Sequence, residues 1–419
     1  MSKRLLWWGD APTAATGFGT VSRNVLSVLH ADGWQIEVLG VNYFGQLHNL
    51  PYTIHTASGP PENDPQGKAT FLRALVHAAQ LGRPFDLTIV NNDIYVVESV
   101  ASDLRKICDQ LGTRSIYYFP IDCKMPSGLT SMVRLCDQAI AYSRFGQLKA
   151  MESTGLRLPA IPHGCESIAP ISDETRRDLR MRAFGCDDDT FVWIGVNRNS
   201  ARKDLAHTIE AFSVFHDFQT NSKLYIHAEA VDHGCSQFSG LPIDLTAAAI
   251  EAGVADSVGF PGNFNLSSGG IPRELLLLGY QGADAFITTH LGEGWGLTVT
   301  EAMAAGIPVV APSNTTMPEI LGLDHPYLYP CSERVWIDNS GYRPRGTVRA
   351  IFEAMKRAYI ERGTKAGKAV LAKQAAFVAE NSWGNVGHMW VSMVNHVMAT
   401  DYRAQREEAA GKAPLVEQV

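Results

Sequence analysis

The feature that most constrains this chain is a regular alternation of short apolar strands with segments of helical periodicity. Between the strands of the first third, apolar residues recur at helical spacing in two segments that end at Gly33 and Gly82. Strands that alternate with helices pair in parallel, so the pattern predicts a sheet covered by helices on both faces. We expect the strands of this sheet at residues 5–8, 36–41, 87–90, 115–119 and 138–142.

The alternation restarts in the second half of the chain. Residues 168–189 are polar and rich in charge, and we interpret them as a linker that leads into a second domain. A buried strand is expected at 191–196, followed by a helix over 204–218. The inward face of that helix should carry Leu205, Ile209, Phe212 and Phe215. Further strands are expected at 224–226, 258–260, 285–288 and 307–310, and two helices over 348–383.

The 419 residues exceed what one hydrophobic core supports, which favours two domains. We predict an α/β fold with two Rossmann-like, doubly wound parallel-sheet domains, residues 1–167 and 168–383. A last helix within residues 384–419 should return to the first domain. Because open parallel sheets bind ligands at the carboxyl ends of their strands, a ligand cleft is expected between the domains. The apolar stripe of the last helix comprises Met389, Trp390, Met393, Val394 and Val397.

Composition disfavours several classes of protein. A net charge of -7 argues against a chain that mainly coats nucleic acid or an anionic membrane. The cysteines number seven, an odd count without a Cys-x-x-Cys pair, which fits reduced thiols better than disulfides. The first apolar run stops at Gly9, too early for a signal peptide, and no run has the length of a membrane span. We therefore expect a cytoplasmic protein without an integral membrane segment.

Residues 289–312 carry the most chemical information in the sequence. Three glycines in alternate positions precede a helix that begins near Leu297 and stops at Gly306. Glycines before a helix let backbone N–H groups approach a ligand, and the helix N-terminus adds partial positive charge. This combination suits a phosphate or a diphosphate.

Two glutamates accompany this loop and helix. Glu293 lies among the glycines, and Glu301 lies eight residues further on. A carboxylate is unsuited to binding phosphate, but it can accept hydrogen bonds from hydroxyl groups beside one. Two carboxylates could therefore hold two hydroxyl-bearing rings on either side of a diphosphate, as in a nucleotide sugar. Two solvated glutamates on an ordinary helix are the alternative, which the glycine spacing and the flanking strands disfavour.

This segment resembles the signature of the retaining GT-B glycosyltransferases of family four, the glycosyl transferases group 1. The shared features are a Glu–seven residues–Glu motif and the helix that opens with residues 317–320, Met-Pro-Glu-Ile. The resemblance implies a GT-B fold, in which Glu293 contacts hydroxyls of the transferred sugar and Glu301 binds the ribose. It also implies a donor-binding loop whose members include Gly294, Gly296, Leu297 and Thr298, with backbone amides on the diphosphate.

A second match to this family follows the strand at 191–196. Arg198 and Lys203 fit an Arg and a Lys that the family carries five residues apart. Two cations at a strand–helix turn can neutralise a diphosphate leaving group as its charge develops. A solvated basic turn is the alternative, but a position at the carboxyl end of a strand favours function. We expect Arg202, between them, to lie outside the site.

The resemblance is weaker in the first domain. Gly17 and Gly19 resemble a glycine-rich loop that contacts the donor phosphate or the acceptor in the family, and we expect them to bind the donor. Many relatives carry a histidine after a middle strand, where this chain has Asp122 as the nearest polar candidate for catalysis. His163 either lies near the donor sugar or is satisfied by the backbone. Residues 91–93, Asn-Asn-Asp, are either an acceptor contact or a simple turn.

We expect neither a metal nor a cofactor. One cluster has metal-ligand residue types, but its spacing matches no zinc pattern, and the aspartates at 187–189 are interpreted as a solvated turn. In the family, the helix N-terminus and the Arg/Lys pair do the work of a metal. The cluster comprises His227, Glu229, Asp232, His233 and Cys235.

The expected reaction moves a sugar from a nucleotide sugar, a UDP- or GDP-sugar, to an acceptor hydroxyl with retained anomeric configuration. The rivals are a nucleotide-sugar epimerase or a phosphorylase-like enzyme on the same fold, and a non-catalytic nucleotide-sugar-binding protein. A Rossmann dehydrogenase is disfavoured, because Ser22 occupies the third glycine position after the first strand. The acidic balance disfavours lipid and nucleic-acid acceptors. The acceptor and the oligomeric state stay open.

Overall fold

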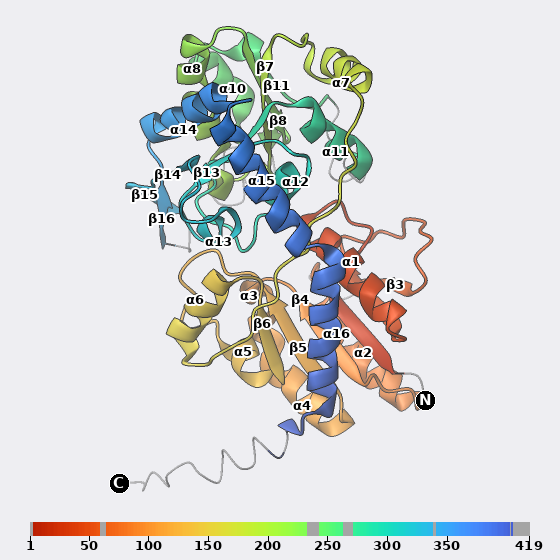
Figure 1. The fold of residues 1–419 in the computed structure, drawn as a ribbon. Helices are drawn as coiled ribbons and strands as arrows, with labels where there is room; N and C mark the ends of the chain where they lie inside the picture. Colours follow the sequence, from red (N-terminus) through yellow and green to blue (C-terminus); the bar gives the residue numbers. More distant parts are fainter. Residues whose placement is uncertain are drawn as a thin grey trace, which may run out of the picture.

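The computed structural model describes residues 3–58, 64–232, 243–262, 271–337, 341–402 and 404. It consists of two α/β domains, one above the other in Figure 1, each with a parallel sheet flanked by helices. The sheet of the first domain has six strands in the order β3-β2-β1-β4-β5-β6, all paired in parallel. Its strands are β1 (Arg4–Asp10), β2 (Gln35–Val41), β3 (Thr53–Thr56), β4 (Leu87–Asn91), β5 (Arg114–Phe119) and β6 (Gln138–Ala141).

The sheet of the second domain also has six parallel strands, in the order β11-β8-β7-β12-β13-β14. Both orders have the Rossmann pattern: the first three strands are added toward one side of the sheet, and the next three are added toward the other side, starting beside the first strand. The predicted α/β fold of two doubly wound parallel sheets is therefore confirmed. The strands are β7 (Phe191–Val196), β8 (Ser222–His227), β11 (Val258–Gly259), β12 (Ala285–Ile287), β13 (Val309–Pro312) and β14 (Leu328–Tyr329).

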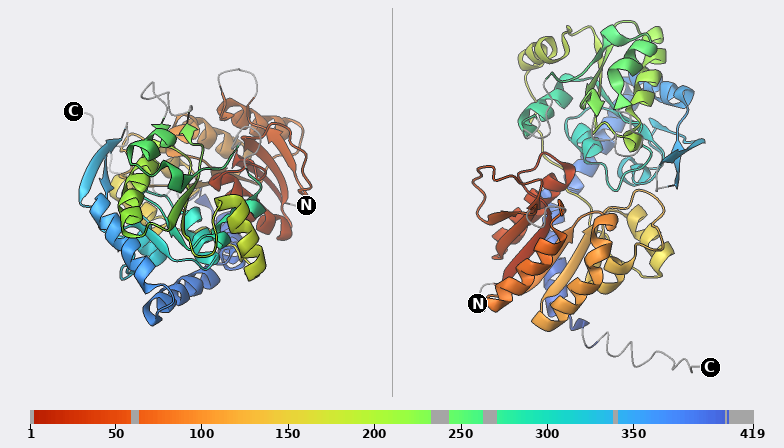
Figure 2. Two further views of the ribbon diagram at one scale, coloured as in Figure 1. Left: turned by 90° about the horizontal axis from the view of Figure 1, so that it is seen from above. Right: turned by 180° about the vertical axis from the view of Figure 1, so that it is seen from behind.

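Helices cover both faces of each sheet (Figures 1 and 2). Those of the first domain are α1 (Gly17–Ala31), α2 (Lys68–Gln80), α3 (Ile94–Val97), α4 (Ala101–Leu111), α5 (Ser131–Leu135) and α6 (Arg144–Thr154). Those of the second are α7 (Asp173–Leu179), α8 (Leu205–Phe218), α10 (Leu245–Glu251), α11 (Arg273–Gly282), α12 (Leu297–Ala304), α13 (Met317–Leu321), α14 (Val348–Glu361) and α15 (Lys365–Glu380). Two short antiparallel pairs complete it, β9 (Val231–Asp232) with β10 (Ile243–Asp244) and β15 (Glu333–Ile337) with β16 (Gly341–Arg345).

The cores explain why these segments became strands. Neighbouring side chains of β1 point to opposite faces of the sheet, so Trp7 packs in one apolar cluster and Trp8 in the other. Both indoles are fully buried, and every residue of β7 is buried as well. Strands buried on both faces read as continuous apolar runs, which is why the runs were recognisable in the sequence.

The last helix, α16 (Trp383–Ala399), leaves the second domain and packs along α1 of the first (Figure 1). Trp390, Val394 and Val397 are fully buried there, and Met393 packs against the same cluster, as predicted. The indole of Trp390 meets the ring of Tyr118 edge-on, with 4.8 Å between centroids. Met389 was wrongly assigned to the stripe, since it is 42% exposed. The first domain therefore contains both the N-terminal segment and this last helix.

The predicted linker at 168–189 is largely helical, which corrects the expectation. Ser172 caps α7 by accepting a hydrogen bond from the amide of Thr175, and two acids occupy its first turn. A short π-helical turn follows over Arg180–Phe184. These start signals were present in the sequence, but the high charge obscured them.

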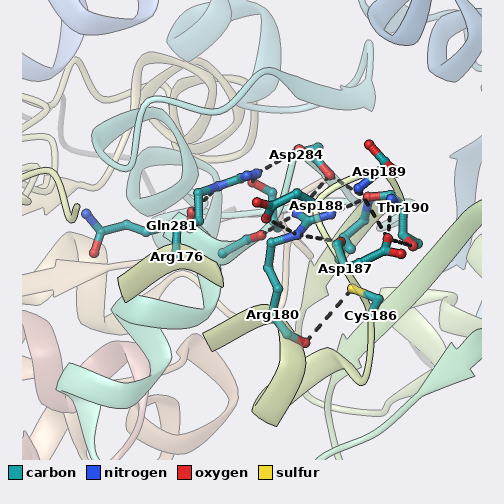
Figure 3. A network of polar contacts seen from close by, with 12 residues as sticks. Arg176, Arg180, Cys186, Asp187, Asp188, Asp189, Thr190, Gln281 and Asp284 are labelled. Atoms are coloured by element: carbon teal, nitrogen blue, oxygen red, sulfur yellow. Dashed lines mark hydrogen bonds and ion pairs between the residues drawn. The ribbon is translucent and has the colours of Figure 1, made fainter. Parts of the chain in front are cut away.

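A buried arginine explains why this charged segment packs against the second sheet (Figure 3). Arg180 is fully buried, and its guanidinium pairs with Asp284 at 3.1 Å and donates to the carbonyls of Gly282 and Asp187. Asp187 in turn accepts hydrogen bonds from Thr190, which closes a turn over the aspartates at 187–189. A buried cation is tolerated only when paired and fully hydrogen-bonded, and Arg180 meets both conditions.

The remaining differences are local. The strand expected from residue 307 begins at Val309, and β3 and the β15–β16 hairpin were not foreseen. Among the described helices, none has both the length and the apolarity that a membrane crossing requires.

We predict that Trp390→Ala lowers the free energy of unfolding by about 3–5 kcal/mol, because it leaves a cavity between α16 and the first sheet. The neighbouring exposed residue provides the control, and Met389→Ala should change stability by less than about 1 kcal/mol. Urea unfolding, monitored by the far-ultraviolet circular dichroism signal of the helices, measures both free energies of unfolding. Equal losses in the two variants would contradict the packing of α16 described above.

Candidate functional site

The candidate site lies where the carboxyl ends of the two sheets face each other. The loop at 292–296 leads from β12 into α12, and it packs against the loop that follows β5 in the first domain. A Cβ atom on Gly292 would lie 2.3 Å from the carbonyl oxygen of Asp122, and one on Gly294 would lie 2.7 Å from Cβ of Pro120. These glycines therefore allow the first domain to approach closely, a role beyond the ligand contact inferred from the sequence.

Gly296 is required for a different reason. Its φ of +120° belongs to a region that residues with side chains rarely adopt, and a Cβ there would lie 2.7 Å from the Met317 side chain. This conformation caps the N-terminus of α12, where Leu297 and Thr298 are half-buried. The N–H groups at the start of α12 are available for an anion.

Glu293 is the centre of the charge arrangement in this loop. Its carboxylate pairs with Lys203 through one oxygen and with Arg202 through the other, the latter at 3.3 Å. Burial raises the pKa of Glu293, but Lys203 and Arg202 more than offset this and hold that pKa well below its ordinary value. Glu293 is therefore an ionised acceptor of hydrogen bonds whose side chain is 13% exposed.

The expectation that Arg202 lies outside the site was wrong. Besides Glu293, its guanidinium contacts Asp122 of the first domain at 3.2 Å and donates to the carbonyl of Gly292. The short 3₁₀ turn at Ala201–Lys203 directs Arg202 and Lys203 toward the same carboxylate. Arg198 is exposed on the loop after β7, so the cations seen on Glu293 are Arg202 and Lys203.

Asp122 connects the domains. A second guanidinium reaches it from the β15–β16 hairpin, because Arg343 contacts its carboxylate at 3.1 Å and also its carbonyl. The neighbouring Arg345 pairs with Asp204 at 2.7 Å, which anchors the hairpin beside the turn that carries Lys203. Nothing in the sequence pattern indicated that this hairpin would supply a buried arginine to the first domain.

Glu301 lies in α12, eight residues after Glu293, and belongs to a second buried cluster of charged side chains. It accepts hydrogen bonds from Arg273 at 2.8 Å and from the hydroxyl of Tyr280 at 2.9 Å. Arg273 also holds Glu166, which precedes the second domain. Burial raises the pKa of Glu301, and Arg273 opposes that rise. Arg273 and Tyr280 are two turns apart on one face of α11, a spacing that could have revealed them.

The glycine loop of the first domain reaches the same place. A Cβ on Gly17 would lie 3.5 Å from the Leu297 side chain, so the N-termini of α1 and α12 meet. Thr16 caps α1 by accepting from the amide of Gly19, and its hydroxyl donates to Asp10. Gly19 itself is packed against the carbonyl of Ala14, which accounts for a glycine there without a ligand.

His163 lies beneath these helix ends, 3% exposed, with its ring 5.9 Å from that of Trp295 in the glycine loop. Burial lowers its pKa to about 3, so the ring is neutral. The Tyr118 hydroxyl donates to the carbonyl of Ile161 and lies 2.7 Å from Nδ1 of His163. One assignment satisfies these groups: Nδ1 carries the proton and donates to Tyr118, which leaves Nε2 as an acceptor.

One buried polar side chain was missed altogether. His290 ends the segment after β12 and is 1% exposed, and neither of its ring nitrogens has a hydrogen-bond partner among the described residues. Burial lowers its pKa to about 3. Buried polar groups without partners are uncommon, and they often mark functional positions.

The cluster with metal-ligand residue types is only partly visible. His233 and Cys235 lie outside the described residues, and burial lowers the pKa of His227 to about 4. Within the described ranges, no group of three His, Cys, Asp or Glu side chains could hold a metal ion.

Comparisons with known proteins agree with this geometry. Residues 245–336, which include the glycine loop and both glutamates, match the family model described as "Glycosyl transferases group 1". Mannosylfructose-phosphate synthase of Agrobacterium fabrum is 29% identical over 182 residues, which cover 42% of this chain and 38% of the relative. The matched region thus spans less than half of that relative.

Solved structures match over nearly the whole chain. Sucrose-phosphate synthase of Thermosynechococcus elongatus has a TM-score of 0.70 at 16% identity, over 96% of this chain and 100% of its own. Anabaena HepE in complex with UDP-glucose has a TM-score of 0.67 at 15% identity, over 94% of this chain and 99% of its own. With the two facing Rossmann sheets, these findings show that the chain has the GT-B fold and that residues 245–336 of its second domain match the glycosyl transferases group 1 family.

Proposed function

We propose that this protein is a glycosyltransferase that moves a sugar from a nucleotide sugar to an acceptor hydroxyl with retained anomeric configuration. The observation that carries the proposal is the half-buried Glu293 carboxylate between Lys203 and Arg202, beside the N-terminus of α12. This arrangement offers a hydrogen-bond acceptor for sugar hydroxyls next to cations for a diphosphate. Helix N-termini and the carboxyl ends of open parallel sheets are where α/β proteins bind anionic ligands.

The parts of the donor have separate places in this proposal. The diphosphate lies against the N-termini of α12 and α1, which meet at Leu297 and Gly17. Lys203 shifts part of its interaction from Glu293 to the phosphate as negative charge develops on the leaving group. Glu293 then accepts hydrogen bonds from the transferred sugar, and Glu301 binds the ribose. Arg273 and Tyr280 fix the Glu301 carboxylate in orientation.

The charge environment supports retention by front-face attack. Glu293 in this loop and Asp122, which packs against it, are each held by two cations, which lowers the nucleophilicity of both carboxylates. The donor's own phosphate oxygen then accepts the proton of the acceptor hydroxyl, and the protein acts by positioning and by stabilising the diphosphate. Arg202, Lys203 and the helix N-terminus supply positive charge at the leaving group, which supports transfer without a metal.

The first donor to test is UDP-glucose, because Anabaena HepE, a structural relative, has been solved with it. GDP-mannose and ADP-glucose complete the panel. We expect release of the nucleoside diphosphate from one of them, and a product whose anomeric coupling in proton NMR equals that of the donor. Interconversion of the donor sugar without release would instead indicate an epimerase, and binding without turnover a non-catalytic protein.

We predict that Glu301→Ala and Lys203→Ala separate binding from turnover. Loss of charge-assisted hydrogen bonds to the ribose should raise the donor KM about 10- to 100-fold in Glu301→Ala. Loss of the cation at the leaving group should lower kcat about 10²- to 10³-fold in Lys203→Ala, with a smaller change in KM. Steady-state kinetics measure both. Glu274→Ala, an exposed acid beside Arg273 on α11, is the control and should match the wild type.

We predict that Gly294→Ala impairs activity by pushing the domains apart, because the new Cβ would meet Pro120 across the interface. An overpacked contact of this kind costs about 1–3 kcal/mol. Small-angle scattering should show a larger radius of gyration, and kcat/KM should fall. Gly128→Ala is the matched control, since a Cβ there has no neighbour within 4 Å. An unchanged domain arrangement with full activity would show that this loop contact is dispensable.

A further inference from the structure

The acceptor side of the cleft is formed by the carboxyl ends of three neighbouring strands of the first sheet. Asp10 ends β1, Asp93 follows β4, and Asp122 follows β5. Strands β1 and β4 are adjacent, and the connection reverses direction between them, which is the position where open parallel sheets bind ligands. Two of these carboxylates have partners, since Thr16 donates to Asp10, and Arg202 and Arg343 hold Asp122.

Asp93 differs from the other two. It is exposed, and its carboxylate forms no hydrogen bond or ion pair with any described residue. It precedes α3 but does not cap it. Although exposed, it is surrounded closely enough that burial raises its pKa to about 6, with Asp122 and Asp10 adding to the rise and Arg202 opposing it. Asp93 is therefore an exposed carboxylate without a described partner, in the field of Asp122, Asp10 and Arg202.

The same strand end carries unused hydrogen-bond donors. Asn91 is fully buried and Asn92 is 8% exposed, yet the amide nitrogen of neither has a partner among the described residues. Their oxygens are used, by Tyr142 and by the amide of Asp93 respectively. Leaving a buried donor unsatisfied costs about 1–3 kcal/mol, so two adjacent cases indicate groups that await a ligand. The end of β4 thus carries two buried amide donors without a partner, directly before the exposed acceptor Asp93.

This pattern suits hydroxyl groups, which both donate and accept. It suits an anion less well, because the neighbouring cations already pair with carboxylates and would be shared with the donor diphosphate. Arg202 and Lys203 pair with Glu293, Arg202 and Arg343 pair with Asp122, and the donor diphosphate would add further negative charge. A phosphorylated acceptor placed at this strand end would face Asp93 and Asp10, while the nearby Arg202 is already paired with Glu293 and Asp122.

Resting on the proposed function, we propose that Asn91, Asn92 and Asp93 bind the acceptor, and that this acceptor is an uncharged polyhydroxy compound and not a sugar phosphate. Asp93 accepts a hydrogen bond from a hydroxyl near the attacking one, and the two asparagines donate to its neighbours. The chain would then differ from mannosylfructose-phosphate synthase and sucrose-phosphate synthase, whose names specify phosphorylated sugars.

The first test compares matched acceptors with UDP-glucose as donor: glucose with glucose 6-phosphate, and fructose with fructose 6-phosphate. The neutral member of each pair should give at least tenfold higher kcat/KM. Asp93→Asn should lower kcat/KM for the neutral acceptors about tenfold, because a charge-assisted hydrogen bond is lost. It should also reduce the preference for neutral over phosphorylated acceptors, because it removes the negative charge that repels the phosphate. Asp103→Asn, on the exposed face of α4 and paired with Lys106, is the control and should leave both values unchanged.

A binding measurement tests the inference without turnover. In UDP-saturated protein, glucose or fructose should shift the backbone amide signals of Asn92 and Asp93 in NMR spectra, and the phosphorylated sugars should do so at least tenfold more weakly. Stronger binding of the phosphates, or no shift at these amides with any sugar of the panel, would overturn the proposal. Failure of donor hydrolysis alone would refute the transferase function and leave this binding result to decide the site.

The pH dependence gives an independent readout. Asp93 accepts a hydrogen bond only as the anion, and a group with a pKa of about 6 is about 10% ionised at pH 5 and about 90% at pH 7. The kcat/KM for a neutral acceptor should therefore rise close to tenfold over this interval in the wild type and stay flat in Asp93→Asn. Tyr117 and Tyr142, which also face Asp93, stay neutral throughout because burial raises their pKa values well above normal. An equal rise of kcat/KM in Asp93→Asn would show that a group other than Asp93 causes the pH dependence.

Discussion

The ion pairs around Glu293 are the interaction on which the rest of this structure depends. A carboxylate is stable in a buried position only if nearby cations compensate for the lost hydration, and Lys203 and Arg202 do so from a single turn after β7. That turn follows β7 and the glycine loop follows β12, which are neighbouring parallel strands. Their contact therefore also fixes the carboxyl ends of these two strands relative to each other. A ligand that enters here exchanges existing ion pairs for new ones and does not bury bare charge, which keeps the cost of binding low.

The same charges join the two domains. Arg202 lies between Glu293 of its own domain and Asp122 of the other, and Arg343 grips Asp122 from the β15–β16 hairpin. The glycines at 292 and 294 complete this contact by leaving room for the backbone of residues 120–122. The contacts that hold the two domains together are therefore the same contacts that form the candidate site. A substitution that separates the domains also removes a partner from Arg202 and so alters the balance of charge around Glu293.

Local patterns predicted the local parts of this structure. The strands that are buried on both faces, the stop of α12 at Gly306 and the inward face of α8 follow from periodicity and from the conformational needs of glycine. Partners supplied from distant segments could not be inferred in this way. Arg273 and Tyr280 meet Glu301 across the fold, and Arg343 reaches Asp122 over more than two hundred residues of chain. Arg202 was misplaced because spacing in sequence does not reveal where a side chain points at a 3₁₀ turn.

The two sides of the cleft consequently differ in how far a motif can describe them. On the donor side, a glycine loop, a helix N-terminus and two glutamates follow one another within a single segment, and their geometry is largely set by that segment. On the acceptor side, each strand contributes one short end, and the sheet order alone brings Asp10, Asp93 and Asp122 together. Since those ends are loops, they can change without disturbing the core. In the proposed function, the chemistry of the acceptor therefore depends on which polar atoms at these ends lack a partner among the described residues, and at the end of β4 those are the amide nitrogens of Asn91 and Asn92 and the carboxylate of Asp93.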